Sequence, residues 1–348
     1  IPEAAIQKIS GDGQSATVST AFASPLVVKV VDANNNPVQS AQVNFAVTGG
    51  SAALGSAQAL TDATGQASTT VTAGATAGTI TVSATSAGFA VTFTLTATPV
   101  APPTPGNITF ENGASFQAGI APGGVAIVSG TNIAPNLPAL VTSFEIVGPP
   151  PTTFEGVSIT FNGTLAPIYY ISNANGQQSV AVQVPFEVQP GSAVSVVVTS
   201  ASGESTTVNT PVQQVAPGVF ASGTTSANQS LAVVVRSDGS YVSANNPAQR
   251  GEVVQLYVTG LGVVSPAAPT GAAGLAGQSV VAQLLVGLNN GGIPFQSADY
   301  APGLVGVYVI TFQVPLNTVT GPSQPVGLLT FDSAGNSYYG QSTYIPIQ

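Results

Sequence analysis

The sequence predicts an all-β protein built as three tandem Ig-like antiparallel β-sandwiches. Three observations support this: apolar and polar residues alternate, turn-forming clusters recur about every ten residues, and one part of the chain repeats. Alternation with a period of two is typical of strands that bury one face, and no stretch keeps the helical period. At roughly 100–200 residues per domain, the 348 residues suffice for two or three domains with cores of their own.

The first sandwich is expected over residues 1–98. Apolar side chains alternate over 43–47, and turn-forming clusters occupy 32–37, 48–51 and 61–65. This spacing is typical of short antiparallel strands joined by tight turns.

A proline-rich segment separates the first sandwich from the rest of the chain. Residues 99–106 carry four prolines, and proline restricts φ and favours an extended polyproline-like backbone. We therefore expect a stiff linker over 99–106.

The chain beyond this linker repeats itself. The tripeptide Gln183-Val-Pro185 recurs 130 residues later as Gln313-Val-Pro315, and both copies follow a strand-like alternation. The repeat predicts two related sandwiches. Their expected boundaries are 107–212 for the first copy and 213–348 for the second, whose loop rich in Gly, Ala and Pro covers 265–277.

The composition excludes several classes of function. Charged residues make up 5% of the chain, and 13 acids against four bases give a formal charge of −9. Nucleic acid is excluded as a partner because phosphate binding needs clustered bases. His, Cys, Met and Trp are absent, which removes the usual general base, thiol nucleophile and soft metal ligands. Without His, a serine nucleophile would need a desolvated lysine beside it, and Lys8 and Lys29 lie in plain strand patterns. We therefore expect no enzyme and no cofactor.

The same composition indicates a location outside the cell. A chain without Cys or Met has nothing that is easily oxidised, which suits a protein beyond the reach of repair enzymes. No apolar run approaches the ~18 residues of a membrane span. The chain begins Ile1-Pro2 without Met, and we expect a secreted form from which a signal peptide has been removed.

Particular strings resemble known bacterial families. Ser10-Gly-Asp-Gly-Gln-Ser-Ala-Thr-Val18 and Thr61-Asp-Ala-Thr-Gly-Gln-Ala67 resemble Ig-like domains of the invasin/intimin type, and the match covers the first domain. Asn112-Gly-Ala-Ser-Phe-Gln-Ala-Gly-Ile-Ala-Pro-Gly123 and Asn162-Gly-Thr-Leu-Ala-Pro-Ile-Tyr-Tyr170 resemble the Solibacter-type paralogous C-terminal domain of acidobacterial secreted proteins, whose halves are similar to IPT/TIG modules. The resemblance implies Ig-like folds in a secreted bacterial protein, and it implies no activity.

Few residues qualify as candidate sites. Asp32, Asn34 and Asn36 match the first positions of a calcium loop, but the later positions that need Gly and Glu hold other residues. A hairpin turn is therefore favoured, and a site for a hard cation stays the alternative. Three Asn-x-Ser/Thr matches to the N-glycosylation pattern are near chance in a chain this rich in Ser, Thr and Asn. They are Asn107, Asn162 and Asn228. The tyrosine pairs 169–170 and 338–339 are expected to pack in sandwiches rather than bind a sugar.

The two ends of the chain carry apolar strands. A free apolar strand at a terminus can complete the sheet of a neighbouring molecule, and the alternative is an edge strand of its own domain. The residues proposed for assembly are Ile1, Ile6, Ile9, Ile345 and Ile347.

The sequence leaves two candidate functions. The first is a non-enzymatic extracellular subunit of a filament or layer, in which copies of the chain join head to tail; low charge permits close packing of copies. The alternative is a monomeric cell-surface adhesin or stalk that contacts a host surface or a polysaccharide through loop tips such as 265–277.

Overall fold

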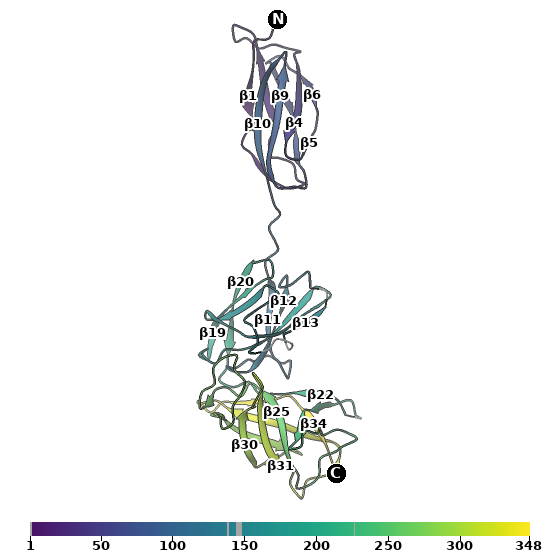
Figure 1. Cartoon of the computed structure of the whole chain (residues 1–348), viewed down its shortest axis with the longest axis vertical. Helices are drawn as coiled ribbons and strands as arrows, with labels where there is room; N and C mark the ends of the chain where they lie inside the picture. Colours follow the sequence, from purple (N-terminus) through teal and green to yellow (C-terminus); the bar gives the residue numbers. More distant parts are fainter. Residues whose placement is uncertain (1, 138, 144–147, 226) are drawn as a thin grey trace. The chain divides into compact units, whose positions relative to one another are not determined.

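The computed structural model describes all residues except 1, 138, 144–147 and 226, and its regular elements are β-strands throughout (Figure 1). The all-β fold class expected from the alternation is confirmed. By their contacts the described residues divide into two compact units, Ile1–Pro102 and Pro103–Gln348. Among these residues no helix is long and apolar enough to span a membrane.

The first unit is a β-sandwich with strand orders β1-β3-β7 and β2-β10-β9-β4-β6, accompanied by the ribbon β5-β8. Inward-facing side chains such as Val28 and Phe93 are fully buried between the sheets. One pairing departs from the antiparallel expectation, because β2 runs parallel to β10. The chain leaves β1, crosses to the other sheet and continues in the same direction as β2. The strands are β1 (Ala5–Ser10), β2 (Ser15–Thr17), β3 (Leu26–Val31), β4 (Gln42–Gly49), β5 (Ala52–Leu54), β6 (Gln58–Leu60), β7 (Gln66–Thr69), β8 (Val71–Ala73), β9 (Gly78–Ser86) and β10 (Phe89–Thr98).

The second unit begins with a sandwich whose sheets have the orders β11-β12-β18-β17-β13 and β14-β15-β19-β20, with β16 paired to β15. Its core is apolar and includes Phe161 and Ile168, both fully buried. The strands are β11 (Gly106–Asn112), β12 (Val125–Thr131), β13 (Leu140–Thr142), β14 (Thr153–Phe154), β15 (Val157–Phe161), β16 (Thr164–Leu165), β17 (Ile168–Ala174), β18 (Gln177–Gln183), β19 (Gly191–Thr199) and β20 (Ser205–Val212).

A third sandwich completes the second unit. Its sheets follow the orders β21-β25-β31-β30-β27-β26, with β24 on β25, and β22-β23-β34-β32-β28-β29, with β33 on β32. Here too one pair is parallel, between β23 and β34. The strands are β21 (Gly218–Val219), β22 (Ala221–Thr224), β23 (Ser230–Ala232), β24 (Val234–Arg236), β25 (Val253–Thr259), β26 (Val264–Ser265), β27 (Ser279–Val280), β28 (Gln283–Leu288), β29 (Gly291–Ile293), β30 (Phe295–Tyr300), β31 (Tyr308–Gln313), β32 (Gly321–Phe331), β33 (Ser337–Tyr339) and β34 (Thr343–Ile347).

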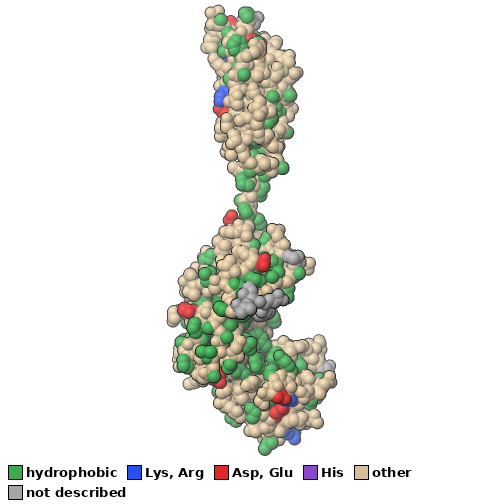
Figure 2. Space-filling model, in the orientation of Figure 1, with side chains coloured by type: hydrophobic (Ala, Val, Ile, Leu, Met, Phe, Trp, Pro, Cys, Tyr) green, Lys and Arg blue, Asp and Glu red, His purple; other side chains and the backbone are tan. Residues whose placement is uncertain are grey.

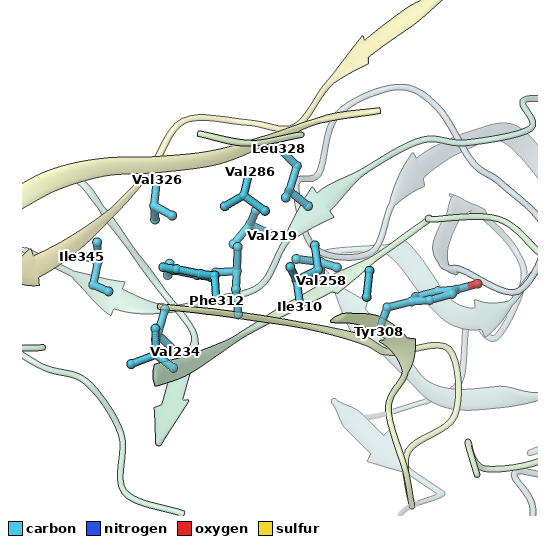
Figure 3. Packing of buried hydrophobic residues seen from close by; sticks show 14 of the residues in the cluster. Val219, Val234, Val258, Val286, Tyr308, Ile310, Phe312, Val326, Leu328 and Ile345 are labelled. Carbon is cyan, nitrogen blue, oxygen red and sulfur yellow. The ribbon is translucent and has the colours of Figure 1, made fainter. Parts of the chain in front are cut away.

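The core of the third sandwich lies between its two sheets (Figure 3). Val286 and Val326 come from one sheet, Ile310 and Phe312 come from the other, and all four are nearly or fully buried. Tyr308 lies at the edge of this cluster with its ring buried, and its hydroxyl donates a hydrogen bond to the carbonyl of Gly262 at 2.5 Å. The polar end of the ring thus keeps a partner while the rest adds apolar contact.

The internal repeat has a counterpart in strand register. Val125 of β12 pairs with Gln183 of β18, and Val253 of β25 pairs with Gln313 of β31. Each glutamine side chain donates to the carbonyl of a glycine just before the first strand, Gly123 or Gly251. The Gln-Val-Pro tripeptide therefore closes the same end of both sandwiches.

Candidate interaction surfaces

The candidate calcium loop is a hydrogen-bonded turn. One carboxylate oxygen of Asp32 accepts the backbone N–H groups of Asn34 and Asn36, each at 2.9 Å, and the Asn36 side-chain amide donates to the other oxygen at 3.2 Å. The hydrogen bond from the Asn36 backbone is the main cause that holds the pKa of Asp32 below its ordinary value. Across the described residues, no group of three or more acidic side chains is placed to hold a metal ion.

The same turn recurs at Asp62 and Asp332, where the Gly and Asn residues close to each aspartate predict turns. Each carboxylate accepts the N–H groups two and four residues later, at 2.8–3.0 Å. The residue three positions after each aspartate has a positive φ. It is a glycine, Gly65 or Gly335, and glycine adopts this conformation without strain. The Thr64 hydroxyl is the first cause of the lowered pKa of Asp62. The recurring spacing Asp-x-x-Gly-Gln/Asn was the signal in the sequence.

Of the three glycosylation candidates, Asn162 and Asn228 lie in turns, and Asn107 lies in β11 where its register shifts. Asn107, Asn162 and Asn228 are exposed, and each has a positive φ between 47° and 58°. Asparagine is enriched at such left-handed positions, so local geometry accounts for all three. Whether any of them carries a sugar stays a prediction.

The residues proposed for strand addition belong to strands paired within their own domains. Ile6 is buried in β1, which pairs with β3, whereas Ile9 is exposed on the same strand. Ile345 and Ile347 are buried in β34, which lies between β23 and β32. An interior strand has no free edge to donate. Ile1 lies outside the described residues.

A polar junction joins the middle and C-terminal sandwiches. Gln183, which is fully buried, donates to the Tyr300 hydroxyl at 3.0 Å and accepts the Gly271 N–H at 2.7 Å. The Phe186 N–H donates to the Thr270 hydroxyl at 2.8 Å, and the Phe186 ring packs edge-on against Tyr300 with centroids 5.5 Å apart. These contacts explain why the two sandwiches form one compact unit.

Loop 265–277, which the adhesin alternative expects to contact an outside ligand, is bound to the middle sandwich in its middle part. Thr270 and Gly271 face the middle sandwich, where Thr270 also donates to the Glu187 carboxylate at 2.5 Å. Composition showed that this segment is a loop, but the polar groups that bind it come from a sandwich some 80 residues earlier in the chain. Leu275 in the same loop stays exposed.

The end of each repeat copy carries an apolar side chain over a glycine. A Cβ at Gly123 would overlap the Phe186 ring, and a Cβ at Gly251 would lie 3.0 Å from the Leu316 side chain. Phe186 and Leu316 both follow Gln-Val-Pro directly, so they occupy equivalent positions. Phe186 packs against the core of the C-terminal sandwich, whereas Leu316 is 78% exposed. The neighbouring Val319 is exposed as well. We call Arg250, Gly251, Gln313, Leu316 and Val319 the C-terminal end surface.

A shallow groove of about 400 Å³ crosses the outer face of the C-terminal sandwich. Its floor contains Gly287 and Gly327, which pair across β28 and β32, and its wall contains Leu285, Leu329 and Tyr339. Neither glycine has a left-handed φ, and a Cβ on either would meet ordinary contacts at 3.8–4.0 Å. Backbone conformation therefore does not demand these glycines.

The surface bearing these features is nearly uncharged. Figure 2 shows the few acidic and basic side chains scattered on the visible face. Two ion pairs occur among the described residues, Lys8 with Asp12 and Arg236 with Glu252, the second at 2.5 Å. Lys8 donates hydrogen bonds to the Asp12 carboxylate and to the Thr92 carbonyl.

Comparison with known proteins assigns the N-terminal domain. The bacterial Ig-like domain (group 1) matches residues 9–99. The chain carries a bacterial Ig-like domain at its N-terminus. The resemblance of that domain to invasin and intimin is thus supported, while the Solibacter-type resemblance of the remainder stays a prediction. No curated protein sequence matches the chain.

Three solved structures illustrate the matches to the whole chain. The surface glycan-binding protein SGBP-B of the Bacteroides ovatus mixed-linkage glucan utilization locus has 12% identity, covers 100% of this chain and 71% of its own, and has a TM-score of 0.29. Invasin, a bacterial integrin-binding protein, has 15% identity, coverages of 99% and 60%, and a TM-score of 0.28. The titin tandem I9–I11 has 8% identity, coverages of 99% and 100%, and a TM-score of 0.25.

Proposed function

We propose that the protein is a non-enzymatic structural subunit of an extracellular bacterial assembly, in which copies join end to end through completed domains. One observation carries this proposal. The C-terminal end surface repeats the end of the middle sandwich that binds the next domain, yet its central apolar residue, Leu316, is exposed. A surface built like a domain junction fits another folded domain.

The proposal differs from strand addition in its physical mechanism. β34 is hydrogen-bonded on both sides, so donating it to a neighbour would first expose Ile345 and Ile347. Removing two fully buried isoleucines from a core costs several kcal/mol, on the order of 2–5 kcal/mol each. Contact between completed sandwiches needs no such opening. An almost uncharged surface also reduces repulsion between copies.

Light scattering after size-exclusion chromatography of the full chain over a concentration series tests the proposal. We expect particles larger than one chain that grow with concentration, and ordered chains of particles by negative-stain electron microscopy. The variant Leu316→Asp should remain one chain at every concentration because a carboxylate replaces the apolar contact. Leu275→Asp, at a position 67% exposed but away from the C-terminal end surface, is the matched control and should assemble. A wild-type protein that stays monomeric, or assembly that ignores Leu316→Asp, contradicts the proposal.

The second candidate function is a polysaccharide-binding adhesin, which the groove favours. Its lining residues are all uncharged, its wall presents the 72% exposed Tyr339, and its glycine floor leaves room for close approach of a ligand. Affinity electrophoresis in gels that contain neutral polysaccharides, mixed-linkage glucan among them, tests this function. Retardation lost in Tyr339→Ala and kept in Tyr241→Ala, a matched tyrosine that is 60% exposed, would support it. Equal mobility with and without each polysaccharide would refute it.

A further inference from the structure

The far end of the N-terminal Ig-like domain is fixed by strand pairing. β10 runs from Phe89 to Thr98, where the linker begins, so Phe89 marks the end that lies away from the linker. Phe89 pairs with Ser86, whose hydroxyl donates to the carbonyl of Gln42, and Gln42 pairs with Leu60. These contacts place the β9–β10 turn and the end of β6 together.

Two acidic turns lie at the same end. The Asp62 turn follows directly after Leu60 and Thr61, and the Val30 N–H donates to the carbonyl of Gly65 within that turn. The Asp32 turn follows Val31 at the end of β3, beside it. We call Asp32, Leu60, Asp62 and Phe89 the N-terminal end surface. The base of β3 is Lys29, which lies two residues before the end of that strand.

This surface combines apolar contact area with negative charge. Leu60 is 65% exposed and Phe89 is also exposed. Asp32 and Asp62 are charged at neutral pH, as carboxyls ordinarily are, and hydrogen bonds within their turns lower the pKa of each further. Neither carboxylate has an ion-pair partner among the described residues.

The C-terminal end surface has the complementary character. Leu316 and Val319 supply exposed apolar area, and Arg250 supplies a positive charge. The guanidinium of Arg250 is held in place by its Nε, which donates to the Thr318 carbonyl at 2.7 Å. Arg236 nearby is already paired with Glu252, so Arg250 is the base that remains for a partner among the described residues of this surface.

We infer that the C-terminal end surface of one copy docks on the N-terminal end surface of a second copy. The inference rests on the proposed function and names the partner of its end surface. Leu316 and Val319 would pack against Leu60 and Phe89, while Arg250 faces the acidic turns. Two different surfaces of one chain then bind each other, and such a heterologous joint extends into a chain of copies instead of closing as a pair.

Complementation between two full-length variants tests this joint. The first variant is Leu316→Asp, which disables the C-terminal end surface. The second is the double variant Leu60→Asp/Phe89→Asp, which disables the N-terminal end surface. All three substituted side chains are exposed, and calorimetry should show wild-type unfolding for both variants.

We expect each variant alone to remain one chain and an equimolar mixture to form a particle of two chains that does not grow further, because one intact surface of each kind remains. With Arg250→Gln on the intact C-terminal end surface, the particle should be weaker at low salt and should respond less to added salt, because the attraction that salt screens is already lost. Assembly of the double variant to wild-type size overturns the inferred joint and leaves the proposed function standing. A double variant that stops at two chains indicates a symmetric contact between C-terminal end surfaces and also overturns it. A wild-type chain that never assembles removes both proposals.

Discussion

Replacing Gln183 tests whether the junction between the last two sandwiches is held by buried polar contacts. Gln183→Leu keeps a side chain of similar length but leaves the buried Gly271 N–H without its acceptor, at a cost of about 1–3 kcal/mol. It also removes the bond to the Tyr300 hydroxyl, worth about 1 kcal/mol, although that hydroxyl keeps two other partners. The free energy of unfolding should fall by about 3 kcal/mol. For a unit of this length, at 2–4 °C per kcal/mol, the melting temperature falls by about 6–12 °C.

The repeat supplies the control for this experiment. Gln313→Leu is the same substitution at the equivalent position, where the side chain is exposed and donates to Gly251 alone. Water replaces that bond, so the change should stay within about 0.5 kcal/mol. Differential scanning calorimetry of the full chain measures both variants and shows whether the transition of the N-terminal Ig-like domain is unaffected. Equal shifts for Gln183→Leu and Gln313→Leu would refute the argument.

Three further predictions concern backbone geometry, pH and the first core. Gly260→Ala should lower the free energy of unfolding by more than about 2 kcal/mol, because Gly260 has a positive φ and a Cβ there would overlap a backbone carbonyl. Gly176→Ala is the control: Gly176 also has a positive φ but its Cβ would meet open space, so roughly 1 kcal/mol is expected. Chemical denaturation of both variants measures the difference. The pKa of Asp62 is lowered, first by the Thr64 hydroxyl, and this adds stability that is present above the ordinary pKa of 3.8 and is lost as pH falls through the lower folded value. The urea midpoint of Asp62→Asn should therefore change less with acid than that of the wild type. Parallel plots of urea midpoint against pH for the two proteins would contradict this. Phe93→Ala should cost about 3–5 kcal/mol and move the calorimetric transition of the N-terminal Ig-like domain alone, so a matching shift of the second unit would count against independent units.

The sequence contained most of the information about the fold class but little about the surfaces. Alternation shows which side chains of a strand are buried, as at Val28 and Phe93, because burial of one face requires a period of two. The same pattern cannot distinguish an edge strand from an interior one. Ile345 and Ile347 alternate in either case. What makes β34 an interior strand is its pairing with β23, more than a hundred positions away, in addition to its pairing with β32.

The junction between the middle and C-terminal sandwiches was not predicted, for a related reason. Gln183 was recognised as part of a repeat, but its partners Gly271 and Tyr300 lie in a loop and a strand with no local signal of a shared contact. The composition of loop 265–277 predicts a surface loop, which the adhesin alternative uses as an example of a ligand contact, and it contains no signal for the contact with the middle sandwich. The parallel pairing of β2 was equally hidden, since alternation carries no information about strand direction.

The tyrosines at this junction also give the molecule a built-in absorbance probe. The chain has nine tyrosines and no tryptophan, so its near-ultraviolet absorption comes chiefly from phenol rings. Tyr169, Tyr300 and Tyr308 lie where the last two sandwiches meet, and burial raises the pKa of all three hydroxyls. Under alkaline conditions the three junction tyrosines therefore ionise later than a tyrosine at its ordinary pKa. Their phenolate absorbance gives a probe of this joint that needs no added dye.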